Sequence, residues 1–159
     1  MKKLLFLITL VTSSLTTYAQ IPAYSAAGII HYTSSKDTLY IINFWASWCG
    51  PCIAELSEFN SLKARYADAP VKVLMVSLDF KEDYPGKLAR FVERKRITPE
   101  VVWLSDTDPN VFIPKIDNSW QGSIPATVIV HPGKGFKKFI EGAVTARQIS
   151  KIVDKVLEE

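Results

Sequence analysis

The chain has only two cysteines in its 159 residues, Cys49 and Cys52, and just two residues separate them. They stand where an apolar run, Leu39 to Trp45, gives way to a helical pattern that continues to about Ala67. The run is rich in β-branched and aromatic residues, which indicates a strand covered on both faces. We therefore predict a strand-to-helix junction with the cysteine pair at the start of the helix.

A structural disulfide is the ordinary interpretation of two cysteines in a protein outside the cytoplasm, but it would fit this spacing poorly. A bridge between Cys49 and Cys52 closes a very small loop and removes little entropy from the unfolded chain. A structural zinc site needs four Cys or His ligands, and His31 and His131 are distant from each other in the sequence. A bond that breaks and re-forms explains the pair better, so we expect no metal and no cofactor.

The first 19 residues have the pattern of a secretory signal peptide. Lys2 and Lys3 precede a short apolar run over residues 4–11, and small residues precede a cut site after Ala19. The apolar run is too short to span a bilayer comfortably. We therefore predict a periplasmic protein with one domain over residues 20–159.

The charge balance gives no reason to expect nucleic acid or an anionic membrane as a partner. The sequence has 19 Lys and Arg against 16 Asp and Glu, a formal net charge of +3, and two of the lysines belong to the predicted signal peptide. A nearly neutral domain does not attract polyanions over its whole surface. We expect a monomer.

The rest of the chain alternates strands with helices. We predict a first helix over residues 22–31, with Ile29 and Ile30 facing inward, and a polar loop over residues 79–85 that includes Asp79. Thr145 and Gln148 form a capping box for a last helix. Further strands are predicted over residues 71–78, 101–104, 127–130 and 136–141, and further helices over residues 88–96 and 111–116. This order predicts an α/β fold, a central mixed β-sheet flanked by helices.

The two cysteines are expected to have unequal roles in thiol–disulfide exchange, which needs a thiolate, an accessible sulfur and a resolving thiol. Cys49 precedes the helix, so unpaired backbone N–H groups and the positive end of the helix dipole lower the pKa of its thiol. Cys52, one turn into the helix, is expected to be more buried. We assign Cys49 as the nucleophile and Cys52 as the resolving thiol.

The sequence Trp-Cys-Gly-Pro-Cys at residues 48–52 resembles the active site of the thioredoxin superfamily, and the predicted order of elements is similar to its fold. The sequence Gly-Ser-Ile-Pro-Ala-Thr at residues 122–127 resembles the cis-proline loop that faces the cysteines in that superfamily. The resemblance implies that Pro125 is cis and that the backbone of Ile124 binds a substrate polypeptide. The substrate-binding surface that it implies consists of Trp48, Gly50, Pro51, Ile124 and Pro125.

Three features resemble the exported TlpA/ResA-like branch. They are the signal peptide, an extra helix and strand between about residues 79 and 104, and Asn43 at the position where thioredoxin has a buried Asp. The resemblance implies a reductase of protein disulfides that a membrane thiol electron donor resets.

Glu55 is the candidate for the proton-transfer group that Asn43 lacks. It follows Cys52 by three residues, and its helical projection falls between Leu62 and Tyr66, inside the apolar stripe. Burial there raises the pKa of a carboxyl, as a general acid/base for Cys52 requires. TlpA/ResA-like proteins commonly carry a Glu at this offset. In the alternative interpretation Glu55 points outward as an acid at the start of a helix.

Two other functions compete with disulfide reduction. A peroxiredoxin-like peroxidase needs a Thr three residues before its peroxidatic cysteine, and that position is Ala46. A copper-carrying dithiol protein of related type spaces its cysteines three apart and adds a His, which this motif lacks.

Overall fold

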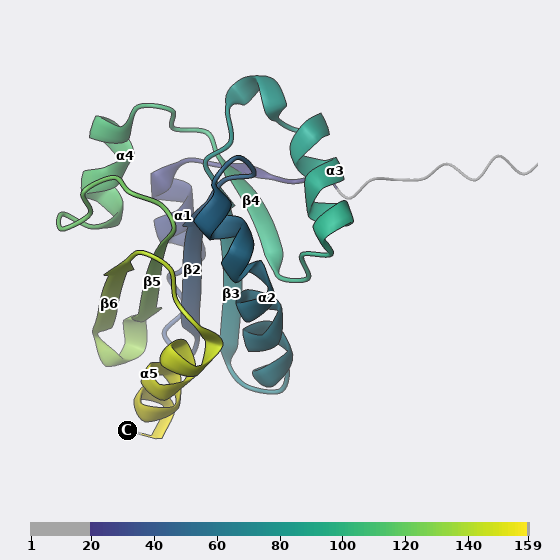
Figure 1. The fold of residues 1–159 in the computed structure, drawn as a ribbon. Helices are drawn as coiled ribbons and strands as arrows, with labels where there is room; N and C mark the ends of the chain where they lie inside the picture. The colour runs from purple at the N-terminus through teal and green to yellow at the C-terminus, as the bar shows by residue number, and fades with distance from the viewer. Residues whose placement is uncertain (1–19, 159) are drawn as a thin grey trace, which may run out of the picture.

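The apolar run that precedes the cysteines is a central strand of the sheet. This strand, β2 (Leu39–Trp45), is buried at every position. It lies between β3 (Val71–Ser77), to which it is parallel, and β5 (Ala126–His131), to which it is antiparallel. The sheet has six strands in the order β1-β4-β3-β2-β5-β6 (Figure 1). The structure is a computed structural model and describes residues 20–158.

Within the described residues, three more strands complete this sheet, and five helices pack against it. The remaining strands are β1 (Ala23–Tyr24), β4 (Glu100–Leu104) and β6 (Phe136–Glu141). The helices are α1 (Ala26–Tyr32), α2 (Gly50–Arg65), α3 (Gly86–Lys95), α4 (Pro109–Ile116) and α5 (Ala146–Glu158). Short 3₁₀ turns occupy Lys81–Asp83 and Pro132–Lys134.

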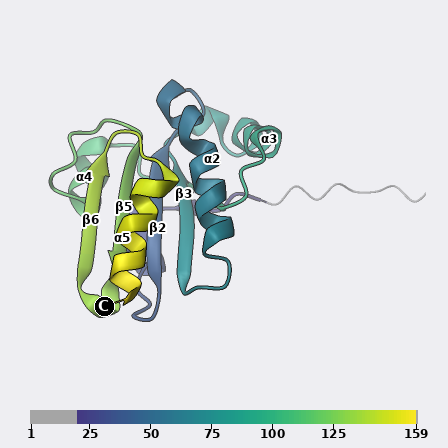
Figure 2. The same ribbon diagram turned by 60° about the horizontal axis from the view of Figure 1, so that its bottom comes forward.

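Helices cover the sheet on both faces, which explains why β2 is apolar throughout. The helices α2, α3 and α5 lie on one face, and α1 and α4 lie on the other (Figures 1 and 2). Alternate side chains of a strand point to opposite faces. Ile41 and Trp45 accordingly pack in the core with α2 and α5, while Ile42 and Phe44 pack in the core with α1 and α4.

The predicted α/β fold with a mixed sheet is confirmed, and the helix–strand insert corresponds to α3 and β4. The capping box is also present, since Gln148 Oε1 accepts from the backbone N–H of Thr145 at 2.8 Å and the N–H of Gln148 donates to Thr145 Oγ1 at 3.3 Å. The predicted signal peptide lies outside the described residues. Within residues 20–158, no helix combines the length and the apolar character that a membrane span requires.

The first predicted helix was wrong in two respects. Its start is the strand β1, whose Ala23 is paired with Trp103 of β4, and the helix begins only after Ser25, whose hydroxyl caps it by accepting from the N–H of Gly28 at 3.1 Å. Ile30, expected to face inward, is 50% exposed, whereas Ile29 is buried. A two-residue strand has no periodicity of its own, because its register comes from a partner far along the chain.

Candidate active site

Cys49 and Cys52 form a disulfide with an S–S distance of 2.02 Å. Cys49 is the N-cap residue of α2, and its Sγ accepts a hydrogen bond from the backbone N–H of Cys52 at 3.3 Å. Cys49 is 6% exposed and Cys52 is 0% exposed. A reaction partner in solution therefore reaches the sulfur of Cys49 before that of Cys52, and the helix N-terminus faces the sulfur that it reaches.

The loop before β5 lies against Cys49. The Ile124–Pro125 peptide bond is cis, and the carbonyl oxygen of Ile124 is 3.8 Å from the Sγ of Cys49. Two backbone N–H groups of this loop, those of Gln121 and Ser123, donate to the carboxylate of Glu141 at 3.0 and 2.8 Å. Sequence reasoning missed Glu141, which stands at the end of β6 with no motif around it.

Glu55 is buried beneath the disulfide-bearing turn of α2, with only 4% of its surface exposed. Its Oε1 accepts from Asn43 Nδ2 at 2.9 Å, and its Oε2 accepts from the backbone N–H of Val144 at 2.7 Å. Desolvation raises the pKa of the Glu55 carboxyl above its usual value, while the hydrogen bonds from Val144 and Asn43 act in the opposite direction. The carboxyl therefore points inward, where its charged form is disfavoured.

Asn43 donates a hydrogen bond to the Glu55 carboxyl, a contact that the sequence did not predict. Its amide nitrogen is shared between Glu55 Oε1 at 2.9 Å and Thr127 Oγ1 at 3.2 Å, and its Oδ1 has no hydrogen-bond partner within the described chain. The side chain is completely buried in the middle of the sheet. Asn43 therefore fixes the direction of the Glu55 carboxyl, in addition to being unable to transfer a proton itself.

Asp79 is a second buried carboxylate near the site, and the sequence indicated only a residue of a polar loop. It is 4% exposed, and its oxygens accept from the backbone N–H of Ser47 at 3.1 and 3.2 Å and from the hydroxyl of Ser77 at 2.7 Å. The hydroxyl of Ser47 donates to the same carboxylate, and Trp103 Nε1 donates to the backbone carbonyl of Asp79 at 2.8 Å. These bonds tie the turn before Cys49 to the end of β3.

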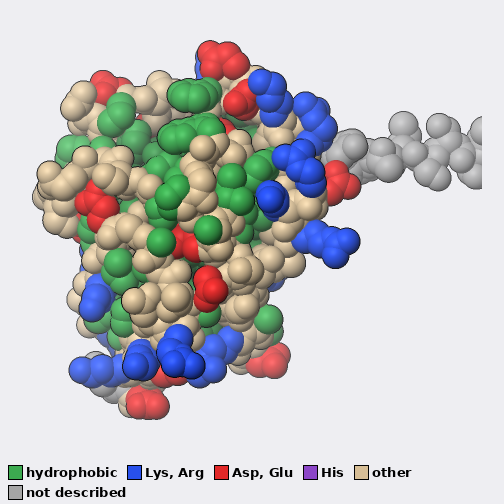
Figure 3. Space-filling view, in the orientation of Figure 1, with side chains coloured by type: hydrophobic (Ala, Val, Ile, Leu, Met, Phe, Trp, Pro, Cys, Tyr) green, Lys and Arg blue, Asp and Glu red, His purple; other side chains and the backbone are tan. Residues whose placement is uncertain are grey.

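Of the predicted substrate-binding residues, Trp48, Gly50 and Pro51 are exposed, Ile124 is half-buried and Pro125 is buried. Gly50 and Pro51 are exposed in the first turn of α2, and Trp48 is 53% exposed. The indole of Trp48 stacks on the ring of Phe80, with ring centroids 5.7 Å apart. Hydrophobic side chains gather over the upper part of this face of the molecule, between α4 and α3 (Figure 3). In the described part of the chain, no three His, Cys, Asp or Glu residues are grouped so that they could hold a metal ion.

Comparison with known proteins places this architecture in a family. The model of the AhpC/TSA family matches residues 22–135, which include the disulfide, the insert and the proline loop. The chain belongs to the AhpC/TSA family. The thiol-disulfide oxidoreductase ResA of Oceanobacillus iheyensis and this chain are 27% identical over 116 residues. The matched residues are 73% of this chain and 56% of that ResA. The chain spans 56% and 61% of the length of two ResA relatives.

Solved structures show the same fold. The crystal structure of StoA from Bacillus subtilis is 26% identical, with a TM-score of 0.59 over 74% of this chain and 84% of that one. A secreted disulfide oxidoreductase of Mycobacterium tuberculosis is 20% identical, with a TM-score of 0.60 over 86% of this chain and 96% of that one. The second match supports the fold alone.

Proposed function

We propose that this protein is a thiol–disulfide oxidoreductase that reduces disulfide bonds of other proteins outside the cytoplasm. The observation that supports the proposal most directly is the Cys49–Cys52 disulfide at the N-terminus of α2, with the Sγ of Cys49 3.8 Å from the carbonyl oxygen of Ile124. The similarity to ResA and StoA is in agreement with this chemistry. Export is supported by the basic start, short apolar run and small residues of positions 1–19.

In the reducing direction, Cys49 reacts first. Its thiolate attacks one sulfur of the substrate disulfide, the substrate S–S bond breaks, and the other substrate sulfur leaves as a thiolate. Cys52, as a thiolate, then attacks the Cys49 sulfur of the mixed disulfide. The Cys49–Cys52 bond forms and the second substrate sulfur leaves, so two electrons have passed from the protein dithiol to the substrate. A membrane thiol electron donor must then reduce the protein again.

Glu55 is proposed to take the proton that Cys52 loses before it attacks. Both residues lie on the buried face of α2, one helical turn apart. Desolvation raises the pKa of Glu55, which brings it closer to the pKa of a thiol. A buried Glu55 therefore accepts a proton from Cys52 more readily than an exposed carboxylate would. Trp48, Gly50, Pro51, Ile124 and Pro125 are proposed to form the surface on which the substrate polypeptide lies.

The family match by itself does not choose between disulfide exchange and the peroxidase alternative. The side chain three residues before Cys49 favours disulfide exchange, because Ala46 is completely buried and has no hydroxyl to offer a peroxide.

The test is to trap the mixed disulfide with Cys52→Ser. Because the resolving thiol is missing, the variant should accumulate a covalent complex with a disulfide protein such as insulin, visible on a non-reducing gel and located on Cys49 by mass spectrometry. The matched control, Cys49→Ser, should form no such complex. If the wild type reduces insulin but Cys52→Ser captures nothing, the assignment of roles is wrong, and if the wild type consumes only peroxide, the proposed function is wrong.

A further inference from the structure

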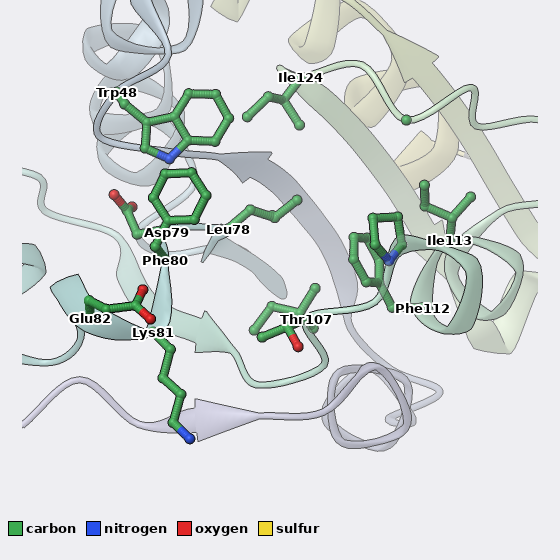
Figure 4. Close-up of a pocket in the computed structure, with 13 residues that line it drawn as sticks. Trp48, Leu78, Asp79, Phe80, Lys81, Glu82, Thr107, Phe112, Ile113 and Ile124 are labelled. Carbon is green, nitrogen blue, oxygen red and sulfur yellow. The ribbon is translucent and has the colours of Figure 1, made fainter.

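A groove of about 530 Å³ extends towards α4 from Trp48, which precedes Cys49 in the chain, and from Ile124, whose carbonyl oxygen is 3.8 Å from the Cys49 sulfur. The rings of Trp48 and Phe80 form one wall, Phe112 and Ile113 of α4 lie across from them, and Ile124 stands at the end nearest the cysteines (Figure 4). This volume is within the range of sites that bind small ligands, and it has room for one or two large side chains.

The aromatic wall stays exposed although its surface is apolar. Phe80 is 61% exposed and Trp48 is 53% exposed, and their rings are nearly parallel, 18° apart. Among residues 20–158, the other exposed large apolar side chains are Ile30 and Val111, neither of which lines the groove. Exposed apolar surface that adjoins a concave site is typical of a surface that binds a partner.

The wall is held in place from beneath. Trp48 directly follows Ser47, and Phe80 directly follows Asp79, so the hydrogen bonds from Ser47 to the Asp79 carboxylate fix the two residues that precede the rings. Ser77 donates to the same carboxylate at 2.7 Å. The stacked rings are therefore preorganised by the sheet edge, which lowers the entropy lost when a ligand binds between them and α4.

The position and charge of the groove indicate what occupies it. A substrate in mixed disulfide with Cys49 has the Cα atoms of the residues on either side of its reacting cysteine about 3.8 Å from the Cα atom of that cysteine, so their side chains lie close to the disulfide. Of the groove-lining residues in the described chain, the charged ones are Asp79, Lys81 and Glu82. The Asp79 carboxylate already accepts hydrogen bonds from protein donors, and Lys81 and Glu82 have opposite signs. Apart from the buried Asp79, the lining therefore has one charge of each sign and otherwise offers a substrate mainly apolar contact.

We infer that this groove binds a large apolar side chain, aromatic or branched aliphatic, that lies next to the reacting cysteine of the substrate polypeptide. The inference rests on the proposed function and adds a substrate class to it: protein disulfides whose cysteine has a large apolar neighbour. Trp48 and Phe80 would then determine specificity, while Cys49 carries out the exchange.

The experiment uses three disulfides and the reduced protein, with second-order rate constants measured by stopped-flow fluorescence. Two are symmetrical peptide dimers joined through one cysteine, which is flanked by phenylalanine in one peptide and by serine in the other. The third is bis(2-hydroxyethyl) disulfide, which has no side chains. The wild type should react at least tenfold faster with the phenylalanine peptide than with the serine peptide, a difference of about 1.4 kcal/mol.

Phe80→Ala should reduce this preference to about twofold, and Phe80→Leu should restore part of it. The matched control Val111→Ala, an exposed apolar residue of α4 outside the groove, should keep the full preference. Equal rates with both peptides in the wild type, or an undiminished preference in Phe80→Ala, would overturn the inference alone. A wild type inert towards all three disulfides would overturn the proposed function as well.

Discussion

Replacement of Asp79 by Ala removes the acceptor that joins the turn before Cys49 to the end of β3. Three donors lose their partner: the N–H and hydroxyl of Ser47 and the hydroxyl of Ser77, which is completely buried. A hydrogen bond to a charged group contributes roughly 1.5–3 kcal/mol, and bonds to one group are not additive. Part of the loss is offset because the variant no longer desolvates a carboxylate. We therefore expect the free energy of unfolding to fall by about 3 kcal/mol.

Urea unfolding followed by circular dichroism measures this loss, and thermal unfolding should show a melting temperature lower by roughly 10 °C for a domain of this size. The matched control is Asp83→Ala, in the 3₁₀ turn that follows, where the carboxylate pairs with Lys87 at 2.6 Å on the surface. Such a pair contributes at most about 1 kcal/mol. If Asp79→Ala destabilises the protein no more than Asp83→Ala does, the hydrogen bonds to Asp79 do not stabilise this turn as expected.

Two further predictions concern burial and close backbone contact. Desolvation raises the pKa of Glu55 in the folded state, so the folded protein binds the Glu55 proton more tightly than the unfolded chain does. The protonated carboxyl therefore adds to the stability of the fold at low pH. This contribution is lost as the pH rises from the unfolded-state pKa of about 4.5 through the higher folded-state pKa. Glu55→Gln should therefore gain stability relative to the wild type as the pH increases through that window, measured as urea midpoints between pH 4 and 8. A wild type whose stability does not fall relative to that of Glu55→Gln would contradict this. The control is Glu93→Gln, at an exposed position of α3. Gly133→Ala should lower the free energy of unfolding by about 1–3 kcal/mol, because its Cβ would lie 2.1 Å from the carbonyl oxygen of Lys36. Gly50→Ala, whose Cβ would meet nothing within 4 Å, should show no such loss in the same urea experiment, and equal effects would count against the clash.

The sequence predicted the parts of the site that local pattern specifies. The strand before the cysteines, the helix after them and the inward direction of Glu55 all follow from the periodicity of apolar residues, and the structure buries Glu55 as its helical projection indicates. Periodicity could not predict that Val144 donates to Glu55, because Val144 lies 89 residues away in the sequence.

Asp79 shows the limit of the same reasoning. An acidic residue in a polar segment is usually solvated, and nothing in residues 79–85 indicates burial. Its burial depends on Ser47, 32 residues earlier, and on the end of β3. A polar residue that is buried by distant donors leaves no periodic signal, whereas the apolar stripe of a helix does.

The order of the strands explains why these distant residues meet. β2 and β3 are parallel and β5 is antiparallel to β2, so the ends of β2 and β3 and the start of β5 share one edge of the sheet. This edge of the sheet carries the cysteine turn after β2, the Asp79–Phe80 segment after β3 and the Ile124 loop before β5. Ligands of α/β proteins commonly bind at such an edge.

The disulfide divides this edge into an inner and an outer side. Cys52 and Glu55 lie inside, with 0% and 4% of their surfaces exposed, whereas Trp48 and Phe80 lie outside and are more than half exposed. In the proposed reaction, a substrate joined to Cys49 contacts the outer side, while the proton transfer takes place on the inner side. Substitutions of the outer residues should therefore change which disulfide is attacked, and substitutions of the inner residues should change how fast the mixed disulfide is resolved. The two properties can vary independently because different strand ends hold them: Asn43 of β2 holds the inner carboxyl, and Asp79 after β3 holds the outer aromatic wall.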